Sequence, residues 1–213
     1  MEMNRSANSR EIDNILNRIE QVEHGFKHIN WGADEVMSLY GEKSCFKIAL
    51  DLFKKESYQA RMLATVILGH LADSNEEALL YLKNVVSTDA NWRVQEMLAK
   101  AFDEICRKRG YEASLSLIEE WMSVENPNTI RAVIEGLRIW TSRPFFKDRP
   151  LLAIELISRH KSHPSEYLRK SVGNALRDIG KKHRGLLLGE LQNWDLSDPL
   201  LLFTYKLVMK QKK

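Results

Sequence analysis

Apolar residues recur at intervals of three and four along most of the chain, whereas strict alternation of apolar and polar residues never persists. The first pattern puts apolar side chains on one face of an α-helix, and the second is typical of a half-buried β-strand. Four segments align on the helical pattern, and a residue that suits a helix N-cap opens each of them. They are residues 58–71, 92–105, 129–140 and 167–179, with Ser57, Asn91, Asn128 and Ser165 as their caps. The pattern predicts an all-α protein.

The four segments repeat with spacings of 34, 37 and 37 residues between their caps. Aligned in this register, they contribute three columns of apolar residues: Ala60, Val94, Ile130 and Leu168; Ala64, Leu98, Ile134 and Val172; and Ile67, Ala101, Leu137 and Ala175. Shorter amphipathic segments lie between them, at residues 76–86, 111–122 and 151–160, with prolines at 127, 150 and 164 near the turns. The columns predict inner helices of stacked repeats, and the shorter segments predict an outer layer.

One such helical pair cannot bury its own apolar face, so at least three must stack. The signatures of tetratricopeptide and ankyrin repeats are missing, and the pattern is closer to HEAT repeats. We therefore expect an α-α superhelix, or solenoid, of HEAT-like helical repeats with a concave inner wall. We also expect one domain over residues 1–213, with the polar residues 1–10 frayed.

Composition excludes several classes of protein. No run approaches the roughly 18 apolar residues of a membrane span, and no signal peptide is recognisable at the start, so we expect a cytoplasmic protein. Cys45 and Cys106 lack a Cys-x-x-Cys partner and are expected to be reduced and buried. The histidines form no His-Glu-x-x-His motif, and phosphate-loop, nucleophile-elbow and redox motifs are missing too. We expect no metal and no cofactor.

Charge is unevenly distributed along the chain. Residues 128–184 contain thirteen basic and five acidic side chains, a net charge of +8, so the remainder carries −5. This segment is a candidate surface for a polyanion, although a solvated basic face without a partner is the simpler alternative. Arg131 and Arg169 occupy equivalent positions near the starts of their helices, where backbone N–H groups also favour an anion. Each could bind a phosphate or form a salt bridge between repeats.

Three stretches resemble a known family. They are residues 91–96 (Asn-Trp-Arg-Val-Gln-Glu), residues 131–138 (Arg-Ala-Val-Ile-Glu-Gly-Leu-Arg) and residues 164–179 (Pro-Ser-Glu-Tyr-Leu-Arg-Lys-Ser-Val-Gly-Asn-Ala-Leu-Arg-Asp-Ile). Over about residues 58–194, the chain resembles the HEAT-like-repeat DNA alkylation-repair glycosylases of the AlkC and AlkD types. The third stretch is most similar to the AlkC type. That type usually carries a further immunoglobulin-like domain, which has no counterpart here, so the resemblance implies a single-domain relative.

The resemblance implies hydrolysis of the N-glycosidic bond of positively charged alkylated purines in double-stranded DNA, of the 3-methyladenine and 7-methylguanine class, without a cofactor. In this family a catalytic carboxylate follows a tryptophan by four residues, and Trp92 and Glu96 reproduce that spacing. A carboxylate there can stabilise positive charge that develops on the deoxyribose and can position a water molecule. Trp92 lies one helical turn away and could contact the sugar or the cationic base.

The resemblance also assigns Arg131 to a phosphate beside the lesion, with Arg138, Arg169, Lys170, Asn174 and Arg177 as further DNA-binding candidates. Two acids accompany these cations, Glu135 and Asp178. They could face the positive charge of the reacting nucleotide as catalytic groups. Alternatively, they could orient Arg131, Arg169 or Arg177.

Aromatic residues leave a further choice open. The AlkD type has an aromatic residue where this chain has Asn174, as the AlkC type would, so stacking at that position is lost. Trp140 could replace the missing aromatic residue on the DNA, or it could be an ordinary core residue. A core role is the commoner one for a tryptophan at helical spacing, and this applies to Trp31, Trp121 and Trp194 as well.

The sequence therefore supports three functional hypotheses. The first is a monomeric, monofunctional glycosylase whose partner is double-stranded DNA with alkylated bases. The second is a non-catalytic protein that binds distorted or branched DNA by its shape and phosphates. The third is a HEAT scaffold for a protein partner.

Overall fold

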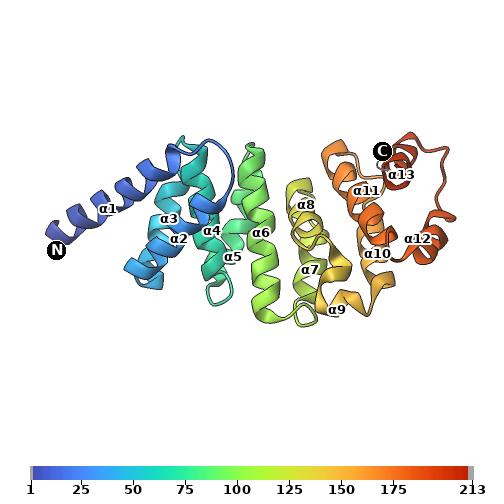
Figure 1. Cartoon of the computed structure of the whole chain (residues 1–213), viewed down its shortest axis with the longest axis horizontal. Helices are drawn as coiled ribbons and strands as arrows, with labels where there is room; N and C mark the ends of the chain where they lie inside the picture. Colours follow the sequence, from blue (N-terminus) through green and yellow to red (C-terminus); the bar gives the residue numbers. More distant parts are fainter. Residues whose placement is uncertain (1, 211–213) are drawn as a thin grey trace. The chain divides into compact units, whose positions relative to one another are not determined.

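The computed structural model describes residues 2–210, and that range contains helices and no β-strand (Figure 1). In chain order the elements are α1 (Glu2–Glu20), α2 (Lys27–Leu39), α3 (Glu42–Phe53), α4 (Tyr58–Leu71), α5 (Glu76–Asn84), η1 (Val86–Thr88), α6 (Trp92–Arg109), α7 (Leu115–Met122), α8 (Pro127–Gly136), η2 (Trp140–Ser142), α9 (Pro144–Lys147), α10 (Pro150–Ser158), α11 (Glu166–Gly180), α12 (Arg184–Leu191) and α13 (Pro199–Met209). The all-α prediction is confirmed.

The chain divides into two compact units, Met1–Ile105 and Cys106–Lys213. In the first unit α4 is central, since α1, α2, α3 and α5 all pack against it. In the second unit α11 takes that place, and α8, α10, α12 and α13 pack against it. The expectation of one repeat domain stays a prediction.

All twelve residues of the three predicted apolar columns are buried, which confirms the alignment of the four inner segments. Two glycines let these helices approach closely. A Cβ on Gly69 in α4 would lie 2.6 Å from the Cβ of Ala101 in α6, and one on Gly173 in α11 would lie 2.6 Å from the Cβ of Leu207 in α13. In each pair the glycine backbone packs directly against a side chain of the neighbouring helix. A side chain at either glycine would clash there.

The predicted helix starts agree best with the structure where a serine caps the helix. Ser57 and Ser165 accept hydrogen bonds from the backbone N–H groups of Ala60 and Leu168, as predicted. The third helix differs, because Asn126 is its cap and Asn128 lies inside it. Pro127 explains the shift, since its fixed φ and missing N–H suit the first helical position.

Two further expectations need correction. α8 ends at Gly136 instead of residue 140, and glycine is a poor helix former. α7 begins at Leu115, four residues later than predicted, after a turn that starts at Gly110 with a positive φ of 86°. The polar residues from Glu2 to Arg10 belong to α1, while Met1 lies outside the described residues, and the fraying of this end stays a prediction. Most residue types in that stretch are compatible with a helix.

Candidate functional site

The start of α6, in the first unit, presents the predicted tryptophan and glutamate. Trp92 is the first residue of the helix and is 53% exposed, which is unusual for so large an apolar side chain. Glu96 lies one turn later and is half-buried. Residues four apart lie on the same face of a helix, so the indole and the carboxylate are neighbours on one accessible surface.

A buried glutamine fixes this end of the helix. The Nε2 of Gln95 donates to the backbone oxygens of Val86, Ser87 and Asp89, at 3.2, 3.3 and 2.7 Å. It therefore joins the first turn of α6 to the loop that precedes it. Since Gln95 is adjacent to Glu96, the same contacts hold the backbone that carries the candidate carboxylate.

An ion pair also holds the same loop. The Nε of Arg61 in α4 lies 2.5 Å from Oδ2 of Asp89, whose Oδ1 accepts from the N–H of Asn91 at 2.8 Å. Asn91 then caps α6 by accepting from the N–H of Arg93 at 2.9 Å. The position of Trp92 is thus determined by α4 as well as by its own helix.

Cations surround the indole and the carboxylate. The guanidinium of Arg93 lies 4.6 Å from the ring centroid of Trp92 and 5.1 Å from that of Tyr58. Lys100 stands one turn beyond Glu96, and its ammonium lies 4.2 Å from the ring centroid of Phe26. Burial lowers the pKa of Lys100, and the nearby charge of Glu96 acts in the opposite direction. The first unit therefore holds a carboxylate and an accessible aromatic ring among cations.

The acids of the second unit have a different environment. Nε and Nη2 of Arg138 both contact Oδ2 of Asp178, at 2.8 and 2.7 Å, and Nη1 lies 3.1 Å from Glu135. Lys181 binds the other carboxylate oxygen of Asp178 at 2.5 Å. Burial raises the pKa of Asp178, but the hydrogen bonds from Lys181 and Arg138 outweigh it and lower that pKa overall. Glu135 and Asp178 thus orient an arginine, and that arginine is Arg138.

Arg131 and Arg169 are largely buried. The guanidinium of Arg131 lies 4.3 Å from the ring centroid of Tyr167. Nη1 of Arg169 donates to the backbone oxygens of His163 and Pro164, at 2.5 and 2.8 Å. Arg169 therefore fastens the turn that leads into α11.

The remaining polar candidates lie on α11 at the surface or near it. Lys170 is exposed and pairs with Glu166 at 2.7 Å. The half-buried Arg177 donates to Oδ1 of Asn174 at 2.7 Å and to the backbone oxygen of Leu207 at 3.1 Å. Since Asn174 accepts from Arg177, it aims that guanidinium.

The tryptophans divide into core and surface. Trp140 is 1% exposed, donates to the backbone oxygen of Ile134 and packs on Phe146 with ring centroids 4.9 Å apart. It is a core residue, so we remove it from the DNA-binding candidates. Trp121 and Trp194 are buried as well, whereas Trp31 in α2 is 68% exposed and does not belong to the core.

Residues that hold the site in place were missed by the sequence analysis, above all Gln95, Arg61, Asp89 and Lys181. Gln95 carries a weak signal, because a glutamine directly before the candidate Glu96 falls on the buried face of the helix. Arg61 and Asp89 are 28 residues apart, and no local pattern connects them.

The described residues contain no cluster of His, Cys, Asp and Glu that could hold a metal ion. Within the same part of the chain, no helix has the length and apolar character that a membrane crossing requires. Cys45 and Cys106 are buried free thiols, as predicted.

The chain is similar to a known protein family and to solved structures. The sequence model described as "DNA alkylation repair enzyme" matches residues 33–193. AlkD2 from Streptococcus mutans has a similar structure, with a TM-score of 0.91 and 43% identity, over 95% of this chain and 97% of that one. The smu.31 protein of Streptococcus mutans UA159 matches with a TM-score of 0.86 and 41% identity, over 93% and 98%.

A more distant structure shares the fold. The alkylpurine DNA glycosylase AlkC of Pseudomonas fluorescens, bound to DNA containing an abasic site analog, matches with a TM-score of 0.67 and 18% identity. The match covers 85% of this chain and 51% of that one. Comparison with curated proteins gives no match.

Proposed function

The chain belongs to the DNA alkylation repair enzyme family, and on this premise we propose that it is a monofunctional DNA glycosylase. Its proposed substrates are positively charged alkylated purines in double-stranded DNA, whose N-glycosidic bond it hydrolyses without a cofactor. The observation that supports this most is the pair at the start of α6, where an exposed Trp92 stands one turn from the carboxylate of Glu96.

In the proposed reaction, Glu96 stabilises the charge of the transition state. A methylated purine cation is already a good leaving group, so positive charge builds up on the deoxyribose as the bond breaks. A carboxylate held in place stabilises that charge and can orient the attacking water molecule. The face of the Trp92 indole can contact the cationic base or the sugar. Gln95 keeps the helix backbone in position during this step.

The second unit supplies the proposed contacts to DNA phosphates. Lys170 and Arg177 are accessible cations, and Arg138 is an arginine whose direction is set by two acids. Arg131 is also a proposed phosphate ligand, although it is less exposed than Lys170 and Arg177. Arg169 is proposed to act on DNA indirectly, by holding the turn before α11 in place. Phosphate contacts of this kind position a protein on DNA without reading its sequence.

The test is release of methylated bases. The protein is incubated with methylated double-stranded DNA, and the released bases are identified by chromatography. We expect release of 3-methyladenine or 7-methylguanine by the unmodified protein. Glu96→Gln should abolish release while DNA affinity stays nearly intact, because the side chain keeps its shape and loses only its charge. Glu104→Gln is a matched control on the same helix and should release bases at the normal rate.

One observation favours a second candidate function. Because Arg138 and Lys181 already bind Glu135 and Asp178, these acids are poorly suited to meet a cationic nucleotide. A protein that binds distorted or branched DNA without chemistry would need only the cations. Salt-dependent DNA binding with no base release, and with Glu96→Gln indistinguishable from the unmodified protein, would establish this alternative.

A further inference from the structure

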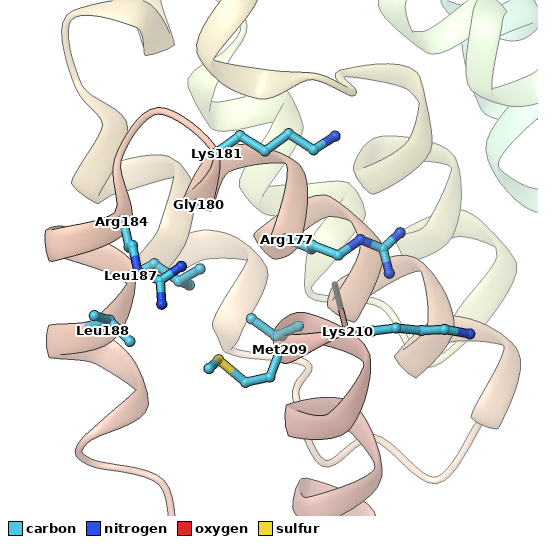
Figure 2. A pocket seen from close by; sticks show the side chains of 9 residues that line it. Arg177, Gly180, Lys181, Arg184, Leu187, Leu188, Met209 and Lys210 are labelled. Carbon is cyan, nitrogen blue, oxygen red and sulfur yellow. The ribbon is translucent and has the colours of Figure 1, made fainter. Parts of the chain in front are cut away.

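A cavity of about 390 Å³ lies in the second unit, between the end of α11, the start of α12 and the end of α13 (Figure 2). Its size falls in the range of small-molecule sites. Four cationic residues line it, and none of its lining residues is acidic: Arg177, Lys181, Arg184 and Lys210. None of the residues at the start of α6 lines this cavity.

Among residues 2–210, three of these cations form no ion pair with a carboxylate. Lys181 is paired with Asp178. By contrast, Arg177, Arg184 and Lys210 form no ion pair with any residue in the described part of the chain. Arg177 is hydrogen-bonded only to neutral oxygens, those of Asn174 and Leu207, and its buried Nε lacks a hydrogen-bond partner. Like charges gathered around one cavity attract an anion.

The rest of the lining is apolar. Leu187 and Leu188 come from α12, and Val208 and Met209 come from the end of α13. In Figure 2 the Arg184 side chain lies beside Leu187, on one side of the cavity, whereas the side chains of Arg177, in α11, and Lys210, directly after α13, project towards the opposite side. Leu188 is 37% exposed and Met209 is 39% exposed, so this apolar surface is open to a ligand.

Arg184, the first residue of α12, lines the same cavity. The helix begins at Arg184, and no side chain caps its first N–H groups. Backbone N–H groups at the start of a helix favour a negative charge.

We propose that this cavity binds a nucleotide through a phosphate monoester, either a free nucleoside monophosphate or the phosphorylated end of a DNA strand. A phosphate monoester carries a charge of about −1.5 to −2 at neutral pH, which three unbalanced cations can match. The apolar lining suits the flat face of a base beside that phosphate. An inorganic anion would leave this lining unused. The inference goes beyond the proposed glycosylase activity and does not depend on it.

Calorimetric titration of the full chain with adenosine monophosphate, adenosine and inorganic phosphate tests the proposal. We expect adenosine monophosphate to bind more tightly than either of the other two. Displacement of a fluorescent nucleotide by oligonucleotides with and without a 5′-phosphate then separates the two sources. Displacement by both oligonucleotides alike, or equal binding of adenosine and its monophosphate, would overturn the proposal.

Matched variants localise the site. Arg184→Ala with Lys210→Ala should weaken nucleotide binding by about tenfold or more. Lys182→Ala with Lys206→Ala removes two exposed cations of the same region that do not line the cavity, and should leave binding unchanged. Leu188→Ser should weaken binding of the nucleotide but not of inorganic phosphate. Equal losses of nucleotide binding in the two double variants would show nonspecific attraction and refute the site. Base release from methylated DNA is measured separately and reports on the proposed glycosylase activity.

Discussion

Arg138 and Asp178 are joined by two nitrogens of the guanidinium that contact one carboxylate oxygen, at 2.8 and 2.7 Å. Arg138 comes after the end of α8 and Asp178 lies in α11, so this contact joins the segment that follows α8 to α11, within the second unit. Asp178 is 8% exposed. A charge at so buried a position is tolerated because it is paired and hydrogen-bonded, which gives Asp178 a structural role in addition to any effect on DNA.

A double-mutant cycle between Arg138→Met and Asp178→Asn measures this coupling. We expect each single variant to lower the free energy of unfolding, and the coupling energy to be about 1–3 kcal/mol, as for hydrogen bonds to charged groups. Chemical denaturation of the four proteins provides the values. Lys170→Met with Asp178→Asn is the control cycle, because Lys170 pairs with Glu166, and its coupling should be close to zero. A coupling near zero between Arg138 and Asp178 would contradict the structural role.

Gln95 should be important for both stability and activity. Its Nε2 donates to three backbone oxygens of the loop before α6, and Gln95→Leu would leave those oxygens without that donor. We expect a loss of about 1–3 kcal/mol in the free energy of unfolding. Base release should also fall at temperatures where the variant is folded, because the turn that carries Glu96 loses its anchor.

The control for Gln95 is Gln21→Leu, an exposed site in the same unit, where a change within about 0.5 kcal/mol is expected. Gln95→Glu makes the comparison sharper. It keeps the shape but replaces the donor with a carboxylate that faces backbone oxygens, so it should be at least as damaging as Gln95→Leu. Full stability of Gln95→Glu would show that the three hydrogen bonds contribute little.

The inner helices could be predicted from sequence because one physical rule determines them. The periodic apolar positions, such as Ala64 and Val172, must be buried, and a serine at position 57 or 165 can cap only a helix that begins directly after it. Boundaries failed where two local signals competed. Asn126 and Asn128 both suit a cap, and Pro127 decides between them through its own preferred position.

The candidate site could be predicted only where neighbours in sequence create it. Trp92 and Glu96 are one turn apart, so helix geometry alone puts them on one face. The partner of Asp178 could not be identified this way, because several arginines were candidates and the choice depends on tertiary packing. The same is true of Trp140 and Trp31, since helical spacing does not reveal which side of a helix is covered.

Histidine titration should make stability depend on pH. Burial lowers the pKa of His160 to about 4, and the charges of His163 and Arg159 act in the same direction. The unfolded chain, with a pKa near 6.5, therefore binds more protons at mildly acidic pH, and stability falls as the pH drops from about 6.5 towards 4. We expect His160 to account for about 1–3 kcal/mol of this loss.

Thermal or chemical unfolding at several pH values tests this expectation. His160→Gln cannot acquire a proton, so its stability should depend less on pH over this interval. His24→Gln is the control for removal of a histidine, because His24 is exposed. An identical pH profile for His160→Gln and the unmodified protein would contradict the assignment.

Trp92 and Trp140 should respond to truncation in opposite ways. Trp92 is half-exposed at the start of α6, so Trp92→Ala should change the free energy of unfolding by less than about 1 kcal/mol. Trp140 is buried against Phe146, and Trp140→Ala should cost about 3–5 kcal/mol by leaving a cavity. Base release should fall strongly in Trp92→Ala under conditions where the variant is fully folded. Trp92→Phe retains an aromatic face and should recover part of the activity. Normal turnover in a folded Trp92→Ala protein would remove the indole from the mechanism and leave Glu96 as the sole catalytic candidate of α6.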